Sequence, residues 1–356
     1  MSGATGKGRG SGRRGVVTLR DVAEVAGVSA QTVSCVVNDN GSISEPIREK
    51  IRKIAADLGY LPNLSAKAMR TGRSQTIGLV ISDIRVPFFP EFAYEVQKAA
   101  RKHRYSVLIV DTGDSPGQMR ERLATLKAMS VEGVITTESV PALFDLHLPT
   151  VMVGSPRRGM DSVRSNDAAG GVMIADYLLA RGHRRIGLVT SPRTDCIPDR
   201  REALLERVKG RAKVVWEVVT PASEVITDEI RGKFRPADVS AVVCSHDLIA
   251  IGLLRALWEM RVSVPDEVSV VGFDDVQWSA VVSPSLTTIR LPFAELAEHA
   301  VQYLLNRINH PRRRAQRWAG DVTLIERETV ADLTSRGAPK VKPAKEPRGE
   351  LSLLGA

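Results

Sequence analysis

The feature that most constrains this chain of 356 residues is the stretch from Thr18 to Asn38. Apolar residues at i, i+3, i+4 and i+7 give its first half an apolar helical face, and Thr18 with Asp21 can cap the first turn. Gly27 then predicts a tight turn, and Ser29 can cap a second helix. Valines face inward in this second helix, which leaves Gln31, Ser34, Cys35 and Asn38 facing outward. The pattern predicts a helix-turn-helix, whose second helix fits the major groove of DNA and can reach base edges there.

A helical hairpin inside an enzyme, with a polar face that is only solvated, is the alternative interpretation of this stretch. A third helix is predicted next, because Ser44 is a candidate cap and Gly59 follows an apolar face made of Ile47, Ile51, Ile54 and Leu58. Three such helices can share one small core, which favours a separate domain.

The charge distribution also points to a nucleic-acid partner. The formal net charge is +9, and residues 1–73 hold twelve Lys and Arg against six Asp and Glu. Residues 334–356 hold five against two, whereas residues 74–333 hold thirty-three of each. The excess positive charge therefore lies beside the helix-turn-helix and in the tail, where it would attract phosphates. A solvated basic surface without a partner is the alternative.

From Gln75 onward, short apolar runs alternate with helical patterns. Strands are predicted at 77–81, 106–110, 133–135, 150–153, 186–189, 214–219, 241–244 and 268–272, and helices at 88–104, 117–129, 170–179 and after 200, 223 and 248. Continuous apolar strands between helices indicate parallel sheets covered on both faces. Two such series, with a late return through Leu286–Ile289, predict an α/β body of two lobes. Its ligand site would lie beyond the carboxyl ends of the strands, in the cleft between the lobes.

The order of residues resembles the lactose-repressor/galactose-repressor (LacI/GalR) family of bacterial transcription regulators. Near the N-terminus the matching segments are Thr18–Ala23, Ala26–Ser29, Thr32–Ser34, Val37–Asn38 and Tyr60–Asn63. In the body they are Ile77–Val80, Pro87–Phe89, Arg181–Gly187, Val264–Pro265, Val268–Asp275, Pro284–Ile289 and Leu324–Thr329. The resemblance implies an N-terminal three-helix helix-turn-helix domain and a two-lobed, periplasmic-binding-protein-like domain with parallel sheets.

Together these patterns divide the chain into five segments. We expect a disordered basic arm at 1–15, the DNA-binding domain at 16–62, a hinge helix or linker at 63–73, the effector-binding and dimerisation domain at 74–333, and a disordered tail at 334–356. The resemblance implies a repressor whose affinity for double-stranded operator DNA is controlled by a small molecule, such as a sugar or sugar derivative, bound between the lobes. It also implies a homodimer, because two symmetric recognition helices would read a pseudo-palindrome.

DNA contacts follow from the same resemblance. They are expected at Thr18, Ser29, Ala30, Gln31, Thr32, Ser34, Cys35 and Asn38, and in the hinge at Asn63, Ala66, Lys67 and Met69. The hinge should become helical only on DNA, with Met69 as a minor-groove wedge. Cys35 stands where the family usually has Arg, so the usual bidentate guanine contact should be absent, and Gln31 and Ala30 should read more of the bases.

Effector contacts are implied at strand ends and at the start of the first helix of the body. The residues are Ser82, Asp83, Phe88, Phe89, Arg200, His246, Asp247 and Asp274. An aspartate after a strand is often a helix cap and a Phe pair is often core, so each has a structural alternative. The chain departs from the family at Val86, Gly154, Ser165, Ala203 and His246. Fewer acidic acceptors argue against a small neutral hexose and leave room for a bulkier or an anionic ligand, or for a regulator that responds to no effector.

Other function classes have less support. The cysteines, Cys35, Cys196 and Cys244, have no metal-ligand spacing, and no Ser/His/Asp or Cys/His set is apparent, so we expect no catalytic, metal or cofactor site. The sequence shows no secretory signal and no segment long enough for a membrane span, which favours a cytoplasmic, nucleoid-associated protein. A secreted sugar-binding protein would explain the two lobes, and a sugar-processing enzyme would explain only the pocket.

Overall fold

The computed structural model describes residues 17–37, 40–60, 72–112, 116–139, 141–155, 158–191, 197–233 and 238–335. It consists of two compact units, which divide between Ser74 and Gln75. Some of the expectations concern residues outside these ranges. They are those for the N-terminal arm, Asn38, the hinge residues Asn63, Ala66, Lys67 and Met69, and the tail from residue 336.

The first unit is the predicted set of three helices, α1 (Leu19–Ala26), α2 (Ala30–Val37) and α3 (Glu45–Asp57). They share a core in which Val22, Val33 and Ile51 are fully buried. The predicted cap of α1 is confirmed: Asp21 N donates to Thr18 Oγ1 at 3.4 Å, and Thr18 N donates to Asp21 Oδ2 at 2.6 Å. These hydrogen bonds lower the pKa of Asp21. Gly27 ends the helix with φ +70°, a conformation that favours glycine.

Two details of the third helix differ from the prediction. The Ser44 hydroxyl makes no capping hydrogen bond; only its carbonyl accepts, from Ile47 N and Arg48 N. Ile47 is 43% exposed, because α3 buries Ile51 and Ala55 instead and Ile47 lies at the edge of that face.

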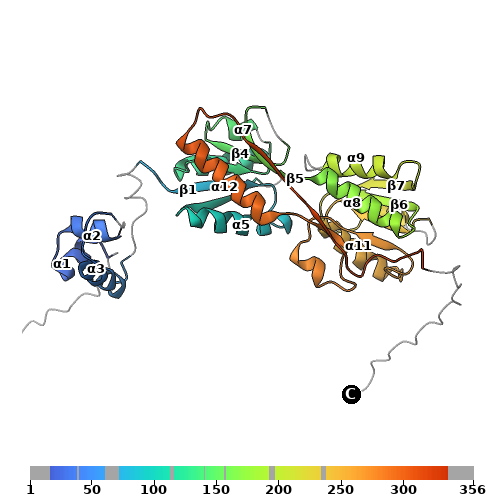
Figure 1. Ribbon diagram of the computed structural model, residues 1–356, viewed down its shortest axis with the longest axis horizontal. Helices are drawn as coiled ribbons and strands as arrows, with labels where there is room; N and C mark the ends of the chain where they lie inside the picture. Colours follow the sequence, from blue (N-terminus) through green and yellow to red (C-terminus); the bar gives the residue numbers. More distant parts are fainter. Residues whose placement is uncertain are drawn as a thin grey trace, which may run out of the picture. The chain divides into compact units, whose positions relative to one another are not determined.

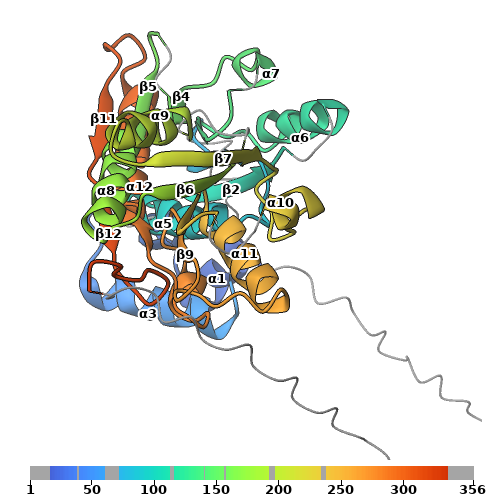
Figure 2. The same cartoon turned by 90° about the vertical axis from the view of Figure 1, so that its right-hand side faces the viewer.

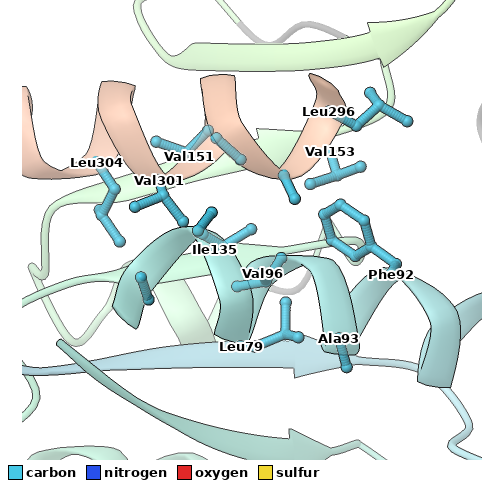
Figure 3. Packing of buried hydrophobic residues seen from close by; sticks show 14 of the residues in the cluster. Leu79, Phe92, Ala93, Val96, Ile135, Val151, Val153, Leu296, Val301 and Leu304 are labelled. Carbon is cyan, nitrogen blue, oxygen red and sulfur yellow. The ribbon is translucent and has the colours of Figure 1, made fainter. Parts of the chain in front are cut away.

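The first lobe of the body is built on six parallel strands in the order β11-β5-β4-β3-β1-β2. Their bounds are β1 (Thr76–Ile81), β2 (Ser106–Asp111), β3 (Val134–Thr136), β4 (Thr150–Val153), β5 (Asp161–Ser165) and β11 (Arg317–Gly320). Helices α5 (Phe88–Lys102) and α12 (Phe293–Asn309) pack on one face, and α6 (Pro116–Ala128) and α7 (Pro141–Phe144) on the other. Figure 3 shows Leu79, Ile135 and Val151 of the sheet packed against Val96 and Val301 of the two helices.

The second lobe has four parallel strands in the order β7-β6-β8-β9. They are β6 (Arg185–Thr190), β7 (Lys213–Val219), β8 (Ala241–Cys244) and β9 (Ser269–Val271). Helices α8 (Asp167–Ala180) and α9 (Ile197–Val208) cover one face, and α10 (Asp228–Lys233) and α11 (Asp247–Glu259) the other (Figure 2). A short 3-10 helix η1 (Gln277–Ala280) follows β9, and β10 (Thr288–Arg290) pairs antiparallel with β12 (Thr323–Ile325).

The chain passes between the lobes at residues 165–167, 291–293 and 320–323 (Figure 1). Each lobe is therefore built from segments that are not contiguous in the sequence. The predicted two-lobed α/β architecture is confirmed. The helix expected after Ser223 begins only at Asp228, and the sequence pattern does not predict β5, β11 or α12. In the portion of the chain that the structure describes, no helix is long and apolar enough to cross a membrane.

Candidate functional site

The outer face of α2 carries the side chains predicted to reach DNA bases. Ser29 caps the helix, since Thr32 N donates to Ser29 Oγ at 3.1 Å. Ala30 and Gln31 are exposed, whereas Thr32, Ser34 and Cys35 are partly buried. Cys35 packs against the next loop: a Cβ added at Gly41 would lie 3.6 Å from its Sγ. The prediction that Cys35 faces outward is therefore only partly met, because its thiol packs against the loop at Gly41.

A second candidate site is the cleft between the two lobes of the body. It encloses about 1020 Å³, some of which is open to solvent. The structure brings seven of the eight predicted effector residues to its wall: Ser82, Asp83, Phe88, Phe89, Arg200, His246 and Asp274. As expected for parallel sheets, these groups lie beyond strand ends or at the start of a helix.

The wall also includes residues that the sequence pattern does not single out. Thr137 and Glu138 follow β3, Arg164 lies on β5, and Pro221 with Ala222 follows β7. Thr137 Oγ1 is buried and has no hydrogen-bond partner within the described structure, so it can bind a ligand. Thr137 could have been predicted, because it follows the strand predicted at 133–135. Arg164 could not, because β5 has no continuous apolar run that would identify it as a strand.

Arg200 is held in place by the protein itself. Its Nε and one terminal nitrogen donate to Asp167 Oδ1 at 3.0 and 2.5 Å, and the other terminal nitrogen donates to the Ser245 carbonyl at 2.6 Å. The guanidinium also lies over the Phe273 ring, 3.6 Å from its centroid. This fixed arginine can present its remaining N–H groups to a ligand in one defined orientation.

Asp274 and His246 form the acidic end of the cleft. His246 Nδ1 lies 3.3 Å from Asp274 Oδ2, and both side chains are almost fully buried. Asp274 has φ +122°, which a non-glycine residue rarely adopts. Such strain is retained where the surrounding structure enforces it, often at ligand sites. Its carboxylate is the strongest hydrogen-bond acceptor that this end of the cleft offers.

Asp247 does not line the cleft, so its predicted direct contact with an effector is not supported by its position. Its carboxylate accepts from Val276 N at 3.0 Å, Ser279 Oγ at 2.6 Å and Thr288 Oγ1 at 2.5 Å. Burial, together with the nearby Asp274 carboxylate, raises the pKa of Asp247 to about 7. Asp247 therefore braces the segment that carries Asp274. A Cβ at Gly272 would come within 2.1 Å of Asp247 Oδ1, which explains the glycine there.

Two polar contacts join the lobes beside the cleft. Arg164 of β5 donates to Asp199 of α9 at 3.0 Å, and Gln277 N donates to Glu91 of α5 at 2.7 Å. Burial raises the pKa of Glu91. Since each contact links one lobe to the other, both would break or lengthen if the lobes moved apart.

The aromatic pair at the start of α5, Phe88 and Phe89, belongs partly to the hydrophobic core, which was the alternative to a role in effector binding. Phe88 contacts Phe89, Phe92 and Phe293 with ring centroids 5.1 to 6.1 Å apart, yet it also reaches the cleft wall. Among the described residues, no group of three or more His, Cys, Asp or Glu side chains is placed to hold a metal ion.

Comparison with known proteins gives consistent matches to both units. Residues 18–63 match the family model "Bacterial regulatory proteins, lacI family", and residues 175–330 match "Periplasmic binding protein-like domain". The ribose operon repressor of Escherichia coli (strain K12) is 31% identical, over 88% of this chain and 99% of the relative.

Solved structures agree with these matches. The Lac repressor dimer bound to operator and the anti-inducer ONPF has a TM-score of 0.74 at 25% identity, covering 88% of this chain and 99% of that one. A LacI family transcriptional regulator from Enterococcus faecium with bound ribose has a TM-score of 0.66 at 25% identity, covering 72% of this chain and 99% of that one.

Proposed function

Because this chain belongs to the lacI family of bacterial regulatory proteins, we propose that it is a repressor that binds operator DNA through α2 and is controlled by an uncharged sugar bound between its lobes. The observation that carries the proposal is that one chain joins a helix-turn-helix to a cleft whose polar groups converge from both lobes. It acts by binding, without catalysis, and we place it in the cytoplasm with the chromosomal DNA.

Selection of bound sequences from random duplex DNA tests the DNA-binding half of the proposal. The expected result is a pseudo-palindrome with half-sites about one helical turn apart, about 10 to 10.5 base pairs. Ala30 and Gln31 would contact base edges, with Thr18, Ser29 and Thr32 on phosphates. The hinge, with Asn63, Ala66, Lys67 and Met69, would order on DNA. A chain that enriches no sequence would contradict the proposal.

Cys35→Arg is expected to change the preferred operator. An arginine there could donate two hydrogen bonds to guanine O6 and N7, so each half-site should gain a guanine, with discrimination of about 1–3 kcal/mol. Sequence selection in parallel with the parent and with Cys35→Ser measures this change. If the preferred site is the same for all three proteins, residue 35 does not reach the bases.

The charges of the cleft support an uncharged effector. Both arginines of the wall are already paired with carboxylates, Arg164 with Asp199 and Arg200 with Asp167. The wall itself adds Glu138 and Asp274, and also Asp83, whose carboxylate is paired with Arg85. A phosphate would bring a further negative charge close to these carboxylates, whereas sugar hydroxyls can donate hydrogen bonds to them. This weighs against the anionic ligand that the sequence left open.

Calorimetric titration of the full chain with D-ribose, D-ribose 5-phosphate and adenine tests the effector class. Ribose is the first sugar to use, because the relative named above is a ribose operon repressor and the Enterococcus faecium structure holds ribose. We expect ribose or a similar neutral sugar to bind more tightly than its phosphate. Tighter binding of the phosphate, or of the nucleobase alone, would contradict an uncharged sugar effector.

An apolar surface on the second lobe supports a homodimer. Trp258 on α11 is 79% exposed, and Val225, Trp278 and Val281 are also exposed. These residues belong to adjoining segments, since the Ser279 hydroxyl bonds Asp247 at the start of α11 and the Glu224 backbone packs against Gly252 of that helix. Exposed apolar patches of this kind mark association surfaces, and the occupant that we propose is a second copy of the chain.

Trp258→Ala is expected to weaken the dimer by about 2 kcal/mol or more, which is roughly 30-fold in the dissociation constant, because buried tryptophans dominate such interfaces. Sedimentation equilibrium measures the effect, with Met129→Ala, an exposed apolar side chain in the other lobe, as the matched control. A parent that stays monomeric, or a Trp258 variant with unchanged self-association, would rule this surface out.

A further inference from the structure

The strand-start edge of the first lobe carries a cluster of exposed arginines that the proposed function does not use. Arg101 and Arg104 lie where α5 ends and the chain turns into β2. Arg312, Arg314 and Arg317 lie where the chain turns from α12 into β11. All five are exposed, and none of them has an ion pair within the described structure. We call these five residues the arginine edge.

The sheet topology places both groups at the same edge of the lobe. All six strands are parallel, so β2 and β11 begin at the edge where β1 begins. The two strands are the outermost of the six, which separates the groups by about 24 Å at a spacing of about 4.8 Å per strand. Figure 1 shows α5 and α12 both running along this lobe.

Acidic side chains at this edge do not offset the arginines, since the exposed Asp145, in the turn before β4, is a single carboxylate against five guanidinium groups. Glu132, just before β3, is turned to its neighbours and accepts from Gln75 N and the Tyr105 hydroxyl. Asp161, the first residue of β5, is 1% exposed and binds Arg307. The edge therefore presents unpaired positive charge to its surroundings, although residues 74–333 as a whole carry equal numbers of both signs.

The covalent path of the chain limits how far this edge can lie from the helix-turn-helix unit. The segment from residue 61 to residue 75 joins the helix-turn-helix unit to Thr76, the first residue of β1, and Thr76 lies at the arginine edge. A segment of that length spans at most about 50 Å. When the first unit is bound to an operator, a segment of this length allows the arginine edge to reach the same duplex, where guanidinium groups can pair with phosphates.

We infer that the arginine edge is a second DNA-binding surface, which contacts phosphates outside the half-sites read by α2 and adds affinity without sequence preference. This inference rests on the proposed function, since it takes DNA as the ligand of the chain. It assigns a role in nucleic-acid binding to a lobe otherwise concerned with the effector.

The test compares the parent with a variant in which Arg101, Arg104, Arg312, Arg314 and Arg317 are changed to Gln. A control variant changes three exposed cations at the strand-start edge of the second lobe, Lys209, Arg211 and Lys213, to Gln; Lys209 and Arg211 are paired with Glu206 and Asp176. Fluorescence anisotropy gives the dissociation constant between about 50 and 200 mM salt. The duplexes are the selected operator, the same operator extended by one helical turn on each side, and a random sequence of the longer length.

For each phosphate that the variant no longer binds, the slope of log K against log salt should become shallower by about 0.9. Between about 50 and 200 mM salt, the variant should then lose about threefold less affinity than the parent for each such phosphate. We expect the parent and the control to bind the extended operator more tightly than the short one, and the five-residue variant to lose this gain. The random duplex should show the same loss of slope.

Equal slopes for the parent and the five-residue variant on the long duplexes would overturn the inference, as would an equal loss in the control variant. A parent that does not prefer the operator over random DNA would contradict the proposed function instead. Its slope on random DNA would still report on the arginine edge, so the two failures are distinguishable.

Discussion

Asp274→Gly is expected to abolish the response to effector while leaving the body about as stable as the parent, because relief of the backbone strain offsets the lost contact with His246. Asp274 holds φ +122°, which costs a non-glycine residue on the order of 1–3 kcal/mol, and glycine adopts this conformation without strain. The variant also removes the carboxylate that, after burial, contributes to the raised pKa of Asp247. Loss of the acceptor should weaken effector binding about 10- to 100-fold for each hydrogen bond that it made. Calorimetry and thermal unfolding of the full chain measure the two effects.

Asp275→Gly is the matched control, and we expect it to make the body less stable than the parent. Asp275 also has positive φ, +56°, but its carboxylate binds Arg290 and Arg327 at 2.6 Å each. Removing it leaves Arg327, which is largely buried, without its ionic partner, and breaking such a pair costs roughly 3–5 kcal/mol. If Asp274→Gly destabilises the body as much as Asp275→Gly does, or if it binds effector like the parent, Asp274 does not have the role assigned to it.

Gly171→Ala is expected to destabilise the body and to weaken effector binding together. Gly171 lies on α8 against the backbone of α9, and an added Cβ would come within 2.1 Å of the Arg200 carbonyl oxygen. The two helices would have to separate, at a cost of about 1–3 kcal/mol or more. Because the Arg200 side chain bonds Asp167 at the start of α8, the same displacement should weaken effector binding. Thermal unfolding and effector titration report the two losses.

Gly232→Ala is the control for the general effect of removing a glycine from a helix. A Cβ there has no neighbour within 4 Å, and its φ is not one that disfavours alanine. Alanine favours helix over glycine by about 1 kcal/mol, so this variant should be neutral or slightly more stable. Parent-like stability and effector affinity in Gly171→Ala would mean that α8 and α9 do not fix Arg200.

Local sequence patterns predict those elements of the fold that each carry their own signal. The Thr18 cap and Gly27 indicate the helix-turn-helix, and apolar runs such as those of β1 and β8 indicate the buried strands. Strand β11 carries Arg317 and Trp318 and is mostly exposed, and β5 begins with a buried aspartate, so neither shows an apolar run. Their place in the sheet depends on pairing between segments far apart in the sequence, such as Arg317 with Ser162, which a local pattern does not contain.

The candidate site was predictable where the resemblance supplies positions, and less so where a residue's role depends on packing. Seven of the eight residues predicted to bind effector reach the cleft, but the Asp247 carboxylate bonds Ser279 and Thr288, which come next to it only in the folded chain. The pairing of Arg164 with Asp199 could not be predicted from the sequence either, because the two residues belong to different lobes. In the proposed function, that pairing, rather than the number of arginines, weighs against an anionic ligand.

The most direct test of an effector-controlled repressor is the coupling between its two sites. The measurement is the dissociation constant of the selected operator with and without saturating ribose, or whichever neutral sugar binds most tightly, together with that of the sugar with and without operator. Linkage requires both constants to change by the same factor, and couplings of this kind are typically about 5- to 150-fold. We predict a reciprocal change within that range, which is absent in Asp274→Gly. Tight binding of both ligands with no effect of either on the other would contradict the account.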